Sequence, residues 1–86
     1  MYYVYVLQSE RDGCFYVGYT QELQQRLKLH NAGKVESTRD RKPLKLVYYE
    51  ACTNQRDALH RERYLKTAYG KRYIRNRLRK YLDSYE

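Results

Sequence analysis

Apolar and polar positions alternate in ways that separate strands from helices along the chain. Residues 2–9 form a run rich in aromatic and β-branched side chains, which is typical of a strand. Asp12 and Gly13 form a turn signal, and residues 14–19 are similar to the returning strand of a hairpin. Residues 45–51 have the same character and predict a third strand.

The first segment with helical spacing covers residues 21–31. Thr20 is suited to cap its start, and Gly33 is suited to end it. Leu23 and Leu27 lie four residues apart and form its apolar stripe. The polar residues 34–44 that follow predict a loop.

Two further helices are predicted in the second half. Residues 55–68 form one, capped by Thr53 or Asn54, and Gly70 is expected to break it. Residues 71–81 form the last, with apolar and aromatic side chains at helical spacing. The order ββαβαα predicts an α+β fold, in which a small three-stranded antiparallel sheet is flanked by three helices.

Size and charge narrow the class of protein. A chain of 86 residues is long enough for one domain and too short for two. A net charge of +8 creates a positive field that attracts polyanions, and nucleic acid is the commonest of them. No segment has the apolar length of a spanning helix, and the first residues lack the features of a signal peptide. We therefore expect a cytoplasmic protein with no membrane partner.

Composition adds two observations. The chain has 12 tyrosines, one phenylalanine and no tryptophan, so tyrosine either builds the core or stacks on bases. Cys14 and Cys52 lack the spacing of metal ligands, and we expect both to be reduced.

One carboxylate interrupts an apolar helix face. Ala58, Leu65 and Tyr69 recur at i, i+7 and i+11, and Glu62 lies within that stripe at i+4. A carboxylate in such a place needs a compensating partner. An arginine would make a structural ion pair, and a divalent cation would make a functional site.

Arg26 and His30 share a face of the first helix because they are four residues apart. An arginine there is suited to bidentate phosphate binding, and the histidine to a hydrogen bond or a proton relay. The alternative is a solvated face on a basic helix.

The predicted hairpin brings two tyrosines to one face. With a two-residue turn, Ser9 faces Tyr16 and Leu7 faces Gly18, and Tyr5 lies further along the same side. Gly18 would leave open floor between the two phenols for a water or a phosphate. The alternative is a core tyrosine pair with a packing glycine.

These features together resemble the GIY-YIG nuclease domain. The tripeptides at residues 3–5 (YVY) and 16–18 (YVG) are similar to its two signature motifs, the Arg26–His30 pair to its first-helix motif, and residues 58–66 (ALHRERYLK) to its glutamate helix. The resemblance extends to the third helix, is closest to small stand-alone bacterial members, and implies a single domain over residues 1–86. Tyr3 replaces the family's glycine, Asn76 is a candidate for an asparagine that several members carry, and Tyr19 stands where some place a lysine.

The resemblance implies single-step hydrolysis of phosphodiesters with one Mg²⁺ or Mn²⁺. Glu62 would hold the metal, and Tyr5 would deprotonate or orient the attacking water. Tyr16 would support Tyr5 or bond the phosphate, Arg26 would clamp the phosphate, and His30 would assist. For Tyr5 to act as a base, Arg26 would have to favour its ionised form.

A metal-dependent endonuclease is therefore the expected function, with DNA favoured over RNA, a role in repair or recombination, and no small-molecule cofactor. Basic residues of the predicted loop would track the backbone without reading sequence: Lys34, Arg39, Arg41 and Lys42. The alternatives are a non-catalytic, tyrosine-rich nucleic-acid-binding module and a structural partner of ribonucleoprotein. Glu62 discriminates between these functions, because a pure binder needs no acid there.

Overall fold

A computed structural model describes residues 1–85 of the chain. Three strands, four α-helices and one 3₁₀ helix follow one another within these residues. They are β1 (Tyr2–Ser9), β2 (Phe15–Thr20), α1 (Leu23–Asn31), the 3₁₀ helix η1 (Glu36–Arg41), β3 (Leu44–Cys52), α2 (Gln55–Leu65), α3 (Ala68–Arg77) and α4 (Arg79–Tyr85). The predicted α+β class and ββαβαα order are confirmed, with η1 added and the last helix divided.

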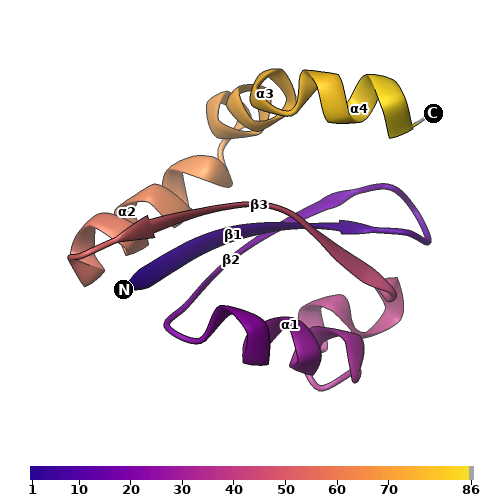
Figure 1. Cartoon of the computed structure of the whole chain (residues 1–86), viewed down its shortest axis with the longest axis horizontal. Coiled ribbons are helices and arrows are strands. Elements are labelled where there is room, and N and C mark those ends of the chain that lie inside the picture. Colours follow the sequence, from indigo (N-terminus) through magenta and orange to yellow (C-terminus); the bar gives the residue numbers. More distant parts are fainter. Residues whose placement is uncertain (86) are drawn as a thin grey trace.

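The sheet is antiparallel, and its strand order is β2-β1-β3. Helix α1 covers one face, and α2, α3 and α4 lie on the other (Figure 1). The central strand β1 is buried from Val4 to Ser9 because it has a neighbour on each side and a layer on each face. This explains why its sequence is a nearly continuous run of apolar and aromatic residues.

Each face of the sheet carries its own hydrophobic cluster, because successive strand residues point to opposite sides. On the α1 side the cluster consists of Tyr5, Leu7 and Leu44, with Tyr16, Leu23, Leu27 and Leu46 packed against it. On the α2 side it consists of Val4, Val6, Ala58, Leu65 and Ile74.

The hairpin differs from the prediction in its register. The connection spans residues 10–14 rather than two residues, so Tyr5 pairs with Gly18, and Leu7 pairs with Tyr16. The predicted pairing of Leu7 with Gly18 is therefore wrong by two residues. A shift of two keeps every side chain on its side of the sheet, so Tyr5 and Tyr16 still share a face.

The segment predicted as a plain loop contains η1, and hydrogen bonds anchor its C-terminal end. The Ser9 hydroxyl donates to the Arg41 carbonyl at 2.6 Å. The Asn31 side chain donates to the Leu44 carbonyl at 2.9 Å and accepts from the Leu44 amide at 2.7 Å. These bonds hold η1 against α1 and the start of β3.

The sequence analysis predicted that Gly70 breaks a helix, and this prediction is wrong, because Gly70 lies within α3. Helix α2 ends at Leu65, and Thr67 caps α3 by accepting from the Gly70 amide at 3.2 Å. A Cβ on Gly70 would collide with the backbone of Tyr64 and Leu65. The glycine is required because α3 folds back tightly on the end of α2.

The predicted last helix, residues 71–81, is two helices that meet at Leu78. Helix α4 is tied to the sheet by the Tyr81 hydroxyl, which donates to the side chain of Gln8. Within the described part of the chain, no helix is both long and apolar enough to cross a membrane.

The substitution Gly70→Ala tests the tight α2–α3 contact. An alanine normally stabilises a helix, but here its methyl group meets fixed backbone. We expect the free energy of unfolding in urea to fall by about 2 kcal/mol or more, the usual scale of overpacking. Ala68→Gly, at the exposed first turn of α3, is the control for helix propensity alone. An unchanged stability of Gly70→Ala would contradict the packing described.

A candidate active site built on a buried tyrosine–histidine pair

Tyr5 and Tyr16 lie on the α1 face of the sheet with their ring centroids 6.4 Å apart. The phenol of Tyr5 lies over Gly18, where an added Cβ would come within 2.9 Å of Tyr5 Cε1 and nearer still to the hydroxyl. The open floor expected above Gly18 is therefore filled by Tyr5 itself. Gly18 is the residue that lets this phenol lie flat across β2.

A line of hydrogen bonds runs from α1 through Tyr5 to η1. Arg26 Nε donates to the Tyr5 hydroxyl at 3.4 Å, and that hydroxyl lies 2.8 Å from His30 Nε2. His30 Nδ1 in turn lies 2.7 Å from Thr38 Oγ1. Tyr5 is 1% exposed, and His30 and Thr38 are fully buried. Four side chains from three elements thus form one polar row inside an apolar layer.

The direction of these bonds follows from which groups can accept. A guanidinium has donors and no acceptor, so the Tyr5 hydroxyl hydrogen points to His30 Nε2 rather than to Arg26. The neutral imidazole then carries its own hydrogen on Nδ1 and donates it to Thr38 Oγ1. Thr38 fixes the tautomer of His30, and His30 fixes the orientation of the Tyr5 hydroxyl.

Tyr16 completes the cluster. Its ring meets the His30 ring edge to face at 5.2 Å between centroids, and its hydroxyl accepts from Ser37 Oγ at 3.3 Å. Ser37 and Thr38 both belong to η1. The sequence analysis missed these two residues because nothing distinguishes them from the other polar residues of a predicted loop.

Burial controls the electrostatics of the pair. Desolvation, reinforced by the charge of Arg26, lowers the pKa of His30 to about 4. Desolvation also raises the pKa of Tyr5, and the hydrogen bond from Arg26 offsets this only in part. Both side chains are therefore neutral near pH 7. Arg26 acts on the Tyr5 pKa in the expected direction, towards the ionised form, but burial outweighs the arginine in the free protein.

Glu62 belongs to α2, the helix that packs on the sheet face opposite the Tyr5 cluster. Helix α2 packs on the face of Val4 and Val6, and the Glu62 carboxylate pairs with Lys66 at 3.1 Å. The charge of Glu62 is nevertheless among the causes that raise the pKa of Tyr5. Tyr5, Tyr16, Arg26 and His30 are thus brought together directly, whereas Glu62 reaches Tyr5 through its field.

The partner of Glu62 differs from the arginine considered as the structural alternative. The nearby Arg61 binds Glu50 instead, through its Nε and Nη2 atoms at 2.9 Å each. Lys66, which does pair with Glu62, has a side chain that is 52% exposed, while that of Glu62 is 19% exposed. Glu62 is consequently paired with an exposed ammonium group rather than with a buried guanidinium.

Comparison with known proteins agrees with this geometry. A family model for the GIY-YIG catalytic domain matches residues 1–78, which include every site residue considered above. The chain belongs to the GIY-YIG family. The membership assigns it to the nuclease type, whose class of partner is nucleic acid.

Similar proteins include bacterial members named UPF0213. One from Bacillus licheniformis is 44% identical over 95% of this chain and 88% of its own length. One from Clostridium perfringens is 46% identical over 77% of this chain and 71% of its own length. The solution NMR structure of a UPF0213 protein from Bacillus halodurans has a TM-score of 0.54 and 35% identity, over 86% of this chain and 82% of that one.

The donor atoms of this GIY-YIG site fit one divalent cation held mainly by waters and substrate. Within residues 1–85, no three His, Cys, Asp or Glu side chains gather as metal ligands do. Mg²⁺ at a phosphate-transfer site is typically bound by one or two carboxylates, and waters and phosphate oxygens complete its ligand shell. Glu62 is the carboxylate available for this here. The Glu62 carboxylate itself is paired with the exposed Lys66 ammonium.

The basic residues expected to follow a nucleic acid backbone differ in whether they are already bound to other parts of the protein. Lys34, Arg39 and Lys42 are solvent-exposed. Arg41 is engaged in the fold, because it pairs with Asp12 at 3.6 Å and donates to the Phe15 carbonyl at 3.3 Å.

Two residues that were compared with the family motifs, Tyr19 and Asn76, lie outside the Tyr5 cluster. The Tyr19 hydroxyl accepts from Gln55 at 3.1 Å, and Asn76 lies exposed on α3. Neither has a described contact with the Tyr5 cluster.

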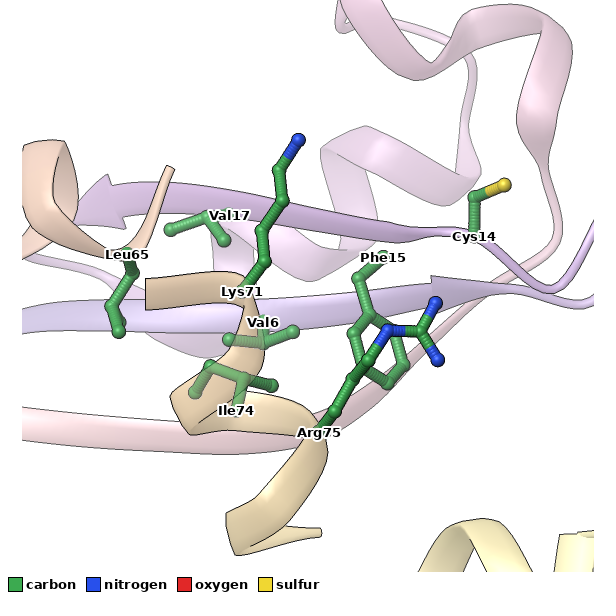
Figure 2. A pocket seen from close by; sticks show the side chains of 8 residues that line it. All are labelled: Val6, Cys14, Phe15, Val17, Leu65, Lys71, Ile74 and Arg75. Carbon is green, nitrogen blue, oxygen red and sulfur yellow. The ribbon is translucent and has the colours of Figure 1, made fainter. Parts of the chain in front are cut away.

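An apolar hollow of about 220 Å³ lies on the opposite face from the Tyr5 cluster (Figure 2). Its walls are Phe15 and Val17 of β2 and Ile74 and Arg75 of α3, among others, and it includes none of the predicted site residues. The candidate active site is therefore identified from its hydrogen bonds and charges. It does not coincide with this hollow.

The depressed pKa of His30 predicts an acid-sensitive fold. The unfolded chain binds a proton on this residue below about pH 6.5, whereas the folded chain does so only below about pH 4. Stability is therefore lost as the pH falls from about 6.5 to about 4, by roughly 3 kcal/mol at this site. Urea unfolding at a series of pH values measures the loss.

His30→Gln should remove this part of the pH dependence, and His60→Gln, at an exposed position of α2, should keep it. An identical pH dependence in wild type and His30→Gln would show that His30 is not held neutral by burial.

Proposed function

We propose that this protein is a Mg²⁺- or Mn²⁺-dependent endonuclease that hydrolyses phosphodiester bonds in DNA. The observation that carries the proposal is the hydrogen-bonded row of Arg26, Tyr5, His30 and Thr38 in a chain that matches the GIY-YIG catalytic domain. A buried tyrosine hydroxyl needs a hydrogen-bond partner in any case. A histidine held in one tautomer is a partner that can also accept the proton of that hydroxyl.

Arg26 is the residue placed to receive a phosphate. Its side chain is half-buried, and Nε donates to the Tyr5 hydroxyl, so its position relative to that oxygen is fixed. A guanidinium has five donors, and those not used on Tyr5 are available to a phosphate. A phosphate bound there lies next to the hydroxyl that would orient the attacking water.

Proton transfer can follow the row of hydrogen bonds. As the Tyr5 oxygen accepts a proton from water, its own hydrogen can move to His30 Nε2, 2.8 Å away. The Arg26 charge contributes to the low pKa of His30, so a phosphate anion that offsets this charge makes His30 a better acceptor. Substrate binding would thereby prepare the relay that the free protein keeps inactive.

A cation bound at Glu62 would stabilise the charge that develops on the phosphate and on the leaving oxygen. Glu62 suits this role because its carboxylate is partly shielded and its field already acts on Tyr5.

We propose DNA as the substrate rather than RNA, with a cytoplasmic role in repair or recombination. The support is the family resemblance together with the +8 charge, which suits any nucleic acid backbone. Cleavage of matched DNA and RNA hairpins under the same conditions separates the two substrates.

A non-catalytic binding module is the second candidate. It is favoured by the exposed tyrosines, which offer stacking surfaces without chemistry. It gives no reason for the Tyr5–His30–Thr38 row, which is buried and therefore has no direct role in binding.

The substitution Glu62→Gln tests the proposed metal ligand. We expect cleavage of a supercoiled plasmid with Mg²⁺ to fall at least about a hundredfold, since a bound metal contributes several kcal/mol to the transition state. The fold should persist, because the pair with the exposed Lys66 adds little stability. Glu22→Gln, at the exposed start of α1, is the control. A folded Glu62→Gln protein that cleaves normally would exclude the assigned role, and an unfolded one would show a structural ion pair.

A second pair of variants separates catalysis from binding. Tyr5→Phe should keep affinity for DNA and lose turnover, because it deletes one hydroxyl that acts in the transition state. Arg39→Ala with Lys42→Ala should weaken binding to all sequences about equally and flatten its dependence on salt. Fluorescence anisotropy without metal and nicking with metal give the two readouts. Loss of affinity in Tyr5→Phe, with no metal-dependent product from wild type, would favour the binding module.

A further inference from the structure

A shallow groove of about 590 Å³ runs over α2, α3 and α4, on the sheet face opposite the Tyr5 cluster. Three tyrosines line it and expose large apolar area: Tyr69 is 70% exposed, and Tyr64 and Tyr73 are 38% exposed each. Exposed rings grouped in this way are unusual in a domain whose other tyrosines mostly pack against the sheet.

Two of these rings are held in place from beneath. The Arg61 guanidinium lies 4.7 Å from the Tyr73 ring centroid and 5.4 Å from that of Tyr64, and it is fixed by its fork to Glu50. Arg61 packs against one side of each ring, the inner side, and we take the outer side of each ring as the one available to a ligand. The rings are therefore preorganised, and binding to them costs little side-chain entropy.

The surroundings of the groove are strongly basic. Residues 68–84 contain six basic side chains and one acidic side chain, Asp83. Arg72, Arg75 and Arg79 line the groove, and no acidic residue does. Among residues 1–84, whose side chains the structure describes, no carboxylate pairs with these three arginines.

The groove adjoins two further depressions, because it shares lining residues with each of them. A second shallow depression of about 330 Å³ shares Tyr73, Asn76 and Arg79 with it and adds Lys80. On the other side, Arg75 also lines the apolar hollow of Figure 2, where its guanidinium lies 5.9 Å from the centroid of Phe15. Arginines and aromatic rings thus line the groove together and also line both neighbouring depressions.

From this arrangement we propose that the α3 groove binds a single-stranded nucleic acid. Unpaired bases would stack on Tyr69 and on the outer sides of Tyr64 and Tyr73, while Arg72 and Arg79 contact phosphates. Rings and cations that line one groove offer partners for both the bases and the phosphates of a strand. A duplex keeps its bases stacked on each other and offers only its phosphates. The proposal shares its class of partner with the proposed function and does not depend on the Tyr5 site.

Anisotropy titrations of the full chain in EDTA test the groove without cleavage. The probes are labelled 12-nucleotide DNA and RNA strands of one mixed sequence and the corresponding DNA duplex. Tyr69→Ala should weaken binding of the single strands about tenfold and affect the duplex much less. Tyr69→Phe should bind as wild type. The two single strands show whether DNA or RNA is preferred.

Matched variants control for general effects. Tyr49→Ala removes a tyrosine of 52% exposure from β3, outside the groove, and should bind normally. Arg72→Glu should weaken binding of both strand types more than Arg56→Glu, which places the same charge change on the first turn of α2. Photo-cross-linking with 5-bromouracil in the DNA strand should label α3 peptides, and this readout needs no substituted protein.

The proposal is overturned if Tyr69→Ala binds single strands like Tyr49→Ala, or if cross-links avoid α2–α4. Its failure is separable from that of the proposed function. A Tyr69→Ala protein that binds and cleaves as wild type would contradict the groove proposal and leave the nuclease proposal intact. Strand binding that depends on Tyr69, with no metal-dependent product, would support the groove proposal and contradict the nuclease proposal.

Discussion

The buried hydrogen bonds from Tyr5 through His30 to Thr38 are the constraint on which the rest of the site depends. All three side chains are removed from water, and each polar atom in the row must therefore find a partner inside the protein. This requirement places η1 against α1, requires Gly18 beneath the Tyr5 ring, and fixes the tautomer of His30. Arg26 at one end of the row is the group that remains partly open to a ligand.

The sheet divides the molecule into two kinds of surface. On the α1 side, buried polar groups replace part of the core and form the candidate catalytic row. On the other side, an apolar core carries α2, to which Glu62 belongs, and α3, which provides most of the tyrosine–arginine groove. The proposed proton relay and the proposed strand-binding groove thus lie on opposite sides of the sheet, and Glu62 of α2 is close enough for its charge to raise the pKa of Tyr5.

Much of this arrangement could be predicted from the sequence. The first strand was predicted with its observed bounds, and the spacing of Arg26 and His30 placed both on the helix face that meets Tyr5. The hairpin register could not be predicted, because a five-residue turn and a two-residue turn leave the same strand pattern. The shared face of the tyrosines survived because the error was an even number of residues.

What the sequence could not show are contacts between segments distant in the chain. Gly70 has the sequence signature of a helix breaker, yet it permits the close approach of α3 to the end of α2. Thr38 and Ser37 lie in a polar stretch whose 3₁₀ helix is held by the bond from Ser9, far from it in sequence, to the Arg41 carbonyl. Burial likewise decided the protonation states of Tyr5 and His30, which composition does not reveal.

The most direct test of the central claim is a long-range ¹H–¹⁵N correlation spectrum of the His30 ring near pH 7. The account predicts a neutral imidazole with its hydrogen on Nδ1, donated to Thr38, and with Nε2 free to accept from Tyr5. Thr38→Val should loosen this tautomer, and Thr38→Ser should preserve it. An imidazolium at neutral pH, or a hydrogen on Nε2 in the wild-type protein, would contradict the row of hydrogen bonds on which the proposed relay is built.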